Sequence, residues 1–162
     1  IMSHFEQALV ARRQEHQSFS AETCLEFEPQ HFQQAAGITY FYNSTKFHYL
    51  YLTCDGDMRE LRLMSVVPGA ISADVQVAAN IPDGPLELVA KVDGAVLQFA
   101  WRPADTSAWI DVGAAQDASM LSDEVSEPGL PNFTGSFIGM ACQDMAGTGL
   151  PADFRSFRYS AV

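Results

Sequence analysis

The amino-acid sequence alternates between two kinds of residue along most of its length. Between Phe19 and Glu28, mostly polar residues occupy every second position, and the residues between them are apolar or uncharged. Successive side chains of a β-strand point to opposite faces of a sheet, so this period of two predicts a strand with one solvated face. The residues expected on its buried face are Phe19, Ala21, Thr23, Leu25 and Phe27.

Further segments of the same character follow at short, regular spacing. Segments 38–42 and 47–53 are rich in aromatic and β-branched residues, which suit a pleated, half-buried surface. The polar residues 43–46 between them predict a turn. The remaining expected strands are 58–64, 86–92, 95–101, 109–112, 133–142 and 154–159, with one weak strand near 74–77 in the Pro- and Gly-rich stretch 66–85.

A tight hairpin is the sharpest local feature. Asp93-Gly94 lies between two apolar runs, and this dipeptide favours a two-residue turn. We therefore expect both residues at positive φ and pairing of 88–92 with 95–99.

Helical patterns are scarce. Residues 4–14 fit one face of a helix and also fit an edge strand, and we favour the strand because the sheets need a cover there. Residues 119–124 predict one short turn. Ten or more short strands predict an all-β fold, a two-sheet antiparallel β-sandwich, with helix in under about a tenth of the chain. The length of 162 residues and the hydrophobic share of 48% fit one domain, 1–162.

Charge and cysteine usage narrow the classes of partner and compartment. The 20 acidic residues exceed the nine Lys and Arg, the net charge is −11, and no basic residue lies between Arg102 and Arg155. This balance argues against nucleic acid or an anionic membrane as partner and is compatible with a neutral ligand such as a sugar. Cys24, Cys54 and Cys142 are widely spaced, which indicates free thiols of a reducing compartment, here expected to be the cytoplasm.

Motifs for chemistry are few. Asp123 and Glu124 are adjacent, whereas paired carboxylates of a glycosidase stand about 5–9.5 Å apart across a sugar, so a solvated loop is favoured. His48 lies among aromatic residues and is interpreted as a hydrogen-bonded sheet histidine, not a metal ligand. No cofactor is expected. The one metal alternative is a structural Ca²⁺ held by Asp153 and Glu26, although a solvent-facing Asp153 is favoured.

Several segments resemble the C-terminal β-sandwich domain of glycoside hydrolase family 43 β-xylosidases. They run in the family's order from about residue 11 to residue 159, and only 66–85 shows no family pattern. The series FTG, GMACQD and PADF is long and does not follow from composition. The matching segments include QAAGITYFYN at 34–43, VAKVDG at 89–94, LSDE at 121–124, FTGSFIGMACQD at 133–144 and PADF at 151–154.

The resemblance implies a concanavalin A-like jelly roll that follows a five-bladed β-propeller. In that family the propeller carries the three catalytic acids of an inverting β-xylosidase, and none of them can be placed in this sequence. We therefore expect no catalytic residue and no enzymatic activity from this chain alone. The implied partners are the propeller of the same parent chain and, in the parent enzyme, a xylo-oligosaccharide.

The resemblance also points to one residue of the substrate pocket. The sandwich of that family brings an aromatic loop to the mouth of the pocket, and on the matching positions the loop is 129–134 and the aromatic residue is Phe133. Alternation alone would turn Phe133 inward at the start of a strand, whereas the resemblance favours an exposed ring.

Three hypotheses for function result. The first is an accessory domain of a β-xylosidase-like hydrolase in xylan breakdown. The second is a free-standing carbohydrate-binding module, which an exposed coplanar aromatic pair would favour, because sugars stack on open rings. The third is a structural module for homo-oligomerisation.

Overall fold

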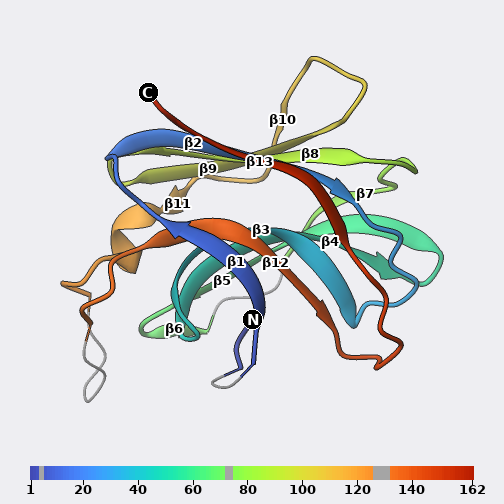
Figure 1. The fold of residues 1–162 in the computed structure, drawn as a ribbon, viewed down its shortest axis with the longest axis horizontal. Helices are drawn as coiled ribbons and strands as arrows, with labels where there is room; N and C mark the ends of the chain where they lie inside the picture. The colour runs from blue at the N-terminus through green and yellow to red at the C-terminus, as the bar shows by residue number, and fades with distance from the viewer. Residues whose placement is uncertain (4–5, 72–74, 126–131) are drawn as a thin grey trace.

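Two antiparallel sheets lie face to face in the computed structural model, which describes residues 1–3, 6–71, 75–125 and 132–162 (Figure 1). Sheet A has the strand order β1-β12-β3-β4-β5-β6, with β7 beside β5. Its strands are β1 (Ala8–Arg13), β3 (Gln34–Asn43), β4 (Lys46–Asp55), β5 (Met58–Val67), β6 (Ala70–Ile71), β7 (Val75–Ala79) and β12 (Phe137–Asp144).

Sheet B has the order β10-β9-β8-β2-β13, with β11 beside β9. One 3-10 turn, η1 (Ala118–Leu121), contacts β4 of sheet A and β9 of sheet B at one end of the sandwich (Figure 1). The strands of sheet B are β2 (Ser18–Glu26), β8 (Leu86–Asp93), β9 (Val96–Pro103), β10 (Ile110–Asp111), β11 (Gln116–Asp117) and β13 (Asp153–Ala161).

The predicted β-sandwich is confirmed. Residues 8–13 form an edge strand, as favoured for 4–14, although positions 4 and 5 lie outside the described residues. The short turn predicted for 119–124 is η1, and the weak strand near 74–77 is β7. In the described residues no helix is long and apolar enough to cross a membrane.

The core between the sheets follows the alternation of the sequence. All five residues expected on the inner face of β2 are buried. The four apolar ones, all but Thr23, pack with inward-facing residues of sheet A, such as Ile38 and Leu50, in one large apolar cluster. Burying a side chain of this size contributes about 1.5–3 kcal/mol, so the inner faces supply the main driving force for folding.

A smaller apolar cluster lies on the other face of sheet A. Phe47, Tyr49 and Tyr51 alternate with the core-facing residues of β4, yet Tyr49 and Tyr51 are only 1% and 4% exposed. Leu9 of β1 packs against them, and the hydroxyl of Tyr49 donates to the backbone carbonyl of Ala141 at 2.8 Å. Sheet A is therefore buried on both faces around β4.

His48 corrects one interpretation. It lies in β4 on the core-facing side, opposite Tyr40 and Ser65 in the register, and it is buried as expected of a sheet histidine. However, neither ring nitrogen has a hydrogen-bond partner in the part of the chain that the structure describes. The hydrogen bond expected for His48 is therefore not found within the described residues.

The hairpin between β8 and β9 differs from the prediction of a turn at Asp93-Gly94. Asp93 pairs with Val96, so the loop is Gly94-Ala95, and of these residues only Gly94 has a positive φ, at 56°. Gly at the first central position is typical of a type II′ turn. Asp93 stays in the strand because its carboxylate accepts a hydrogen bond from the Ser18 hydroxyl at 2.7 Å on neighbouring β2.

Gly37 marks a close approach of backbones in sheet A. A Cβ atom at this position of β3 would overlap the carbonyl oxygen of Leu50 on β4. We expect Gly37→Ala to lower the free energy of unfolding by about 1–3 kcal/mol, because the strands must separate to admit the methyl group. Denaturant unfolding checks this, with Gly147→Ala as control, since a Cβ at Gly147 (φ 73°) meets nothing and reports backbone strain alone. A Gly37→Ala loss of less than about 0.5 kcal/mol, the range of an ordinary surface substitution, would contradict the steric explanation.

Candidate functional site

Phe133 extends from a loop that enters β12. Its ring is 86% exposed, which confirms the orientation that the resemblance favours. The strand starts at Phe137, so the prediction of a strand from residue 133 is wrong at its beginning. Gly135 has a φ of 65°, which interrupts extended backbone before the strand. The preceding loop positions 129–131 lie outside the described residues.

Asp123 and Tyr42 hold the backbone beside Phe133. The Asp123 carboxylate accepts hydrogen bonds from the Tyr42 hydroxyl at 2.5 Å and from the Gly135 N–H at 3.1 Å. The Thr134 N–H donates to the Tyr42 oxygen at 3.4 Å. The two residues that follow Phe133 are thus both tied to a single carboxylate–phenol pair.

The ionisation of this pair follows from the same contacts. Hydrogen bonds from Tyr42 and then from Gly135 lower the pKa of Asp123, so the carboxylate is charged at neutral pH. Burial, reinforced by Asp123, raises the pKa of Tyr42, which keeps its proton. Asp123 is exposed, as the solvated-loop interpretation expects, but it acts as a hydrogen-bond acceptor for the loop, a role that the interpretation missed.

Lys46 supports the chain segment on the other side of the loop. Its side chain is 1% exposed, and its ammonium donates to the carbonyls of Ser122 at 2.9 Å and Val125 at 2.8 Å. The ammonium also lies 3.6 Å from the centroid of the Tyr42 ring, a cation–π contact. A buried charge requires such partners. Lys46 therefore fixes the positions of those two carbonyls.

Arg13 completes the support from β1. Its guanidinium donates to the Thr134 carbonyl and lies 4.9 Å from the ring centroid of Phe137. Asn132, next to Phe133, donates its side-chain amide to the Val125 carbonyl at 2.9 Å. We name the four side chains that hold this region the loop anchor: Arg13, Tyr42, Lys46 and Asp123.

Most of the loop anchor was missed at the level of sequence. The sequence predicts a polar turn at Lys46, whereas Lys46 is the first residue of β4. Its side chain lies on the core-facing side of the strand, as do those of His48 and Leu50. The spacing of two residues between Lys46, His48 and Leu50 was the sequence signal that could have placed Lys46 on the core-facing side. Arg13 and Tyr42 carried none, because their partners are remote in sequence.

The loop anchor holds the backbone next to the exposed ring of Phe133, and its carboxylate is not arranged for proton transfer to a substrate. Asp123 is occupied by two donors, and Glu124 is its immediate neighbour on the same exposed segment. Glycoside hydrolysis instead needs two carboxylates on opposite sides of the sugar. This geometry is therefore suited to contact with a partner or a ligand.

One of the two candidate Ca²⁺ ligands is engaged by an arginine, and the other, Asp153, is exposed to solvent. Glu26 and Asp153 are register partners of β2 and β13, but the Glu26 carboxylate accepts from the Arg155 guanidinium at 2.6 and 2.9 Å. Among the described residues no cluster of three or more His, Cys, Asp or Glu side chains could hold a metal ion. Cys24, Cys54 and Cys142 are free, as predicted.

A stacked aromatic platform for sugar is not found in the described residues. Tyr49 and Tyr51 stack with ring centroids 4.9 Å apart, but both are buried. The other stacked pairs each include a buried ring, either Phe19 or Phe47. Trp109 is half-buried and carries the Arg102 guanidinium 4.2 Å from its ring centroid. The observation that would favour a free-standing carbohydrate-binding module is thus lacking here.

Comparison with known proteins identifies the family. The sequence model described as the β-xylosidase C-terminal concanavalin A-like domain matches residues 1–160. The chain is 37% identical over 169 residues to xylosidase/arabinosidase 43B of Humicola insolens, matching 100% of this chain and 31% of the relative. It is 32% identical over 164 residues to the β-xylosidase of Bacillus subtilis strain 168, matching 98% of this chain and 30% of the relative.

A solved structure agrees with these relatives. The xylan β-1,4-xylosidase from Bacillus halodurans C-125 superposes with a TM-score of 0.86 at 31% identity, covering 98% of this chain and 30% of that one. The chain therefore spans about 30% of the length of the relatives it matches. With the sandwich fold, this match over nearly every residue shows that the chain belongs to the concanavalin A-like domains of the C-terminal region of glycoside hydrolase family 43 β-xylosidases.

Proposed function

We propose that this chain is the accessory domain of a β-xylosidase-like hydrolase and that it places Phe133 at the mouth of the parent enzyme's substrate pocket. The observation that carries the proposal is the combination of a highly exposed ring with a firmly held backbone. An apolar ring gains free energy only when something covers it. The loop anchor holds Phe133 where a neighbouring domain can do so.

A fixed ring has a clear physical use at a pocket mouth. Aromatic rings stack on the apolar face of a sugar, and a ring that excludes water strengthens the electrostatic interactions inside a site. Because Asp123 and Lys46 already hold the backbone at Gly135 and Val125, docking would cost little further conformational entropy at these residues.

The parent protein is proposed from the relatives. Their names describe xylosidases and a xylosidase/arabinosidase, and this chain corresponds to about 30% of each. We propose that a catalytic propeller in the same parent chain is the domain partner, that short β-1,4-xylosides are the substrates and that xylan breakdown is the process. Three free thiols support a cytoplasmic location.

We expect this chain alone to hydrolyse neither p-nitrophenyl β-xyloside nor xylobiose. The reason is that Asp123 is committed to holding the loop and Glu124 cannot face it across a sugar. Release of p-nitrophenol and of xylose, measured against a buffer blank at micromolar protein, checks this. Turnover that co-elutes with the chain in size-exclusion chromatography would defeat the proposal of an accessory role.

Phe133→Ala should separate stability from function. In this chain we expect the free energy of unfolding to stay within about 0.5 kcal/mol, because an exposed ring loses few contacts. In the parent enzyme we expect kcat/KM for xylobiose to fall about tenfold or more, because burying such a ring contributes about 1.5–3 kcal/mol. Phe19→Ala, in the core, is the contrasting variant and should cost about 3–5 kcal/mol. Unchanged xylobiose kinetics would show that Phe133 does not reach the pocket.

Lys46→Met should weaken the support of the backbone near Phe133 without removing the Phe133 side chain itself. Methionine keeps the length of the side chain but removes the ammonium donor, so the Ser122 carbonyl loses this partner and the Val125 carbonyl keeps only the Asn132 amide. The free energy of unfolding should therefore fall by about 1–3 kcal/mol. Amide exchange at Thr134 and Gly135 should accelerate.

The control is Lys91→Met, which removes an exposed ammonium. In the parent enzyme the effects of Lys46→Met and Phe133→Ala on kcat/KM should be less than additive, because both act through the position of one ring. Full additivity would mean that Lys46 acts by another route.

A further inference from the structure

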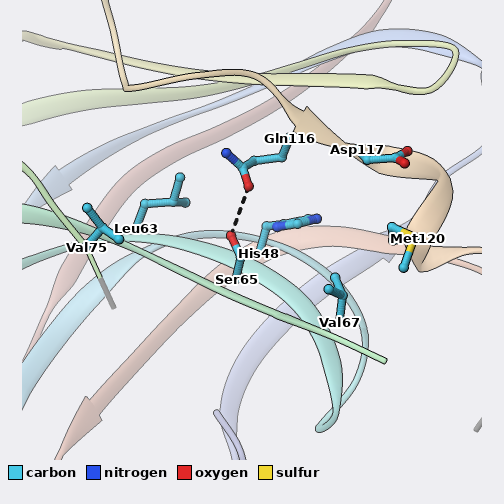
Figure 2. A pocket seen from close by; sticks show the side chains of 8 residues that line it. All are labelled: His48, Leu63, Ser65, Val67, Val75, Gln116, Asp117 and Met120. Atoms are coloured by element: carbon cyan, nitrogen blue, oxygen red, sulfur yellow. Dashed lines mark hydrogen bonds between the residues drawn. The ribbon is translucent and has the colours of Figure 1, made fainter. Parts of the chain in front are cut away.

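A pocket opens between sheet A and the segment formed by β11 and η1 (Figure 2). Its volume is about 340 Å³, near the lower end of ordinary ligand sites. Leu63, Val67, Val75 and Met120 give it an apolar wall. None of the residues of the loop anchor lines it, so an inference about this pocket does not depend on the role of Phe133.

His48 borders this pocket with two unused hydrogen-bonding atoms. The residue is 3% exposed, and neither Nδ1 nor Nε2 has a partner among the described residues. Buried polar atoms of proteins are nearly always paired, and an exception points to a bound molecule, a water or a function. In Figure 2 the imidazole extends from β4 between Ser65 and the side of the pocket formed by Met120 and Asp117.

The charge state of His48 follows from its surroundings. Burial lowers its pKa to about 4, while the backbone carbonyl and then the carboxylate of Asp117 act in the opposite direction. The imidazole is therefore neutral at pH 7 and offers one N–H donor and one nitrogen acceptor. The charged group on the same face of β4, Lys46, is directed to the carbonyls of Ser122 and Val125.

Three further polar side chains complete the lining. Gln116 of β11 and Ser65 of β5 share a hydrogen bond of 3.2 Å that spans the pocket, as Figure 2 shows. The Asp117 carboxylate accepts from the Ser119 N–H at 3.0 Å. No Lys or Arg lines the pocket, so its one formal charge is negative.

We propose that this pocket binds one uncharged, hydroxyl-rich molecule of monosaccharide size. A hydroxyl both donates and accepts, which matches the mixed character of Ser65 and Gln116. The two unpaired nitrogens of the neutral imidazole are themselves buried, so the ligand reaches them as the pocket lining adjusts around it. The carboxylate of Asp117 opposes an anion. The apolar wall suits the C–H face of a sugar ring. When the ligand binds, the hydrogen bond between Ser65 and Gln116 breaks, and both side chains form hydrogen bonds to the ligand instead.

The test is titration of this chain with D-xylose at pH 7, followed by saturation-transfer NMR and by the ring resonances of the histidines. We expect saturable binding that shifts the signals of His48, while those of the exposed His31 stay in place. D-xylonate, which has a similar chain of hydroxyls but carries a carboxylate, should bind at least tenfold more weakly, because it meets Asp117.

Matched variants locate the site. His48→Leu and Gln116→Leu should each weaken D-xylose binding at least tenfold, and His31→Leu should not change it. Gln116 is only half-buried, so its variant keeps the test valid if His48→Leu fails to fold. Absence of saturable binding, binding unchanged in Gln116→Leu, or equal affinity for D-xylonate would each overturn the proposal.

Discussion

The buried ammonium of Lys46 is the contact on which the placement of Phe133 depends. A charge cannot be left in an apolar interior without partners, so the carbonyls of Ser122 and Val125 must remain where the ammonium meets them. Lys46 begins β4, a central strand of sheet A. The position of an exposed ring is thereby linked to a central strand of the sandwich.

Sheet A shows why the exposed chemistry lies in loops. Its core-facing side packs against sheet B, and its other side is filled by Phe47, Tyr49 and Tyr51. Around β4 the described part of sheet A is buried on both faces, so it offers no open aromatic surface there for a glycan to lie on. Recognition then falls to segments at the ends of the strands, a division between rigid scaffold and functional loop that is common in proteins.

The sequence predicted more of the fold than of the candidate site. The alternation in β2 named the buried set correctly, from Phe19 to Phe27, because the period of a strand is a local property. Alternation could not predict the register at Asp93. The observed pairing of Val92 with Leu97 is shifted by two residues from the expected pairing. Because a shift of two residues leaves every side chain on the same face, the hydrophobic pattern does not distinguish the two registers. For Lys46 and His48 the pattern indicated a face, but their surroundings come from segments about 70 residues further along the chain.

The pairing of the outermost strands has a consequence for synthesis. β1 pairs with β12 and β2 pairs with β13, so residues near the start of the chain find partners more than 120 residues later. Such non-local pairing makes folding slow, and it leaves strand edges open until the partners exist. On the ribosome neither sheet can be completed before the last strands emerge. Residues 132–136 directly precede β12, so the contacts that hold the backbone beside Phe133 form only as the domain closes.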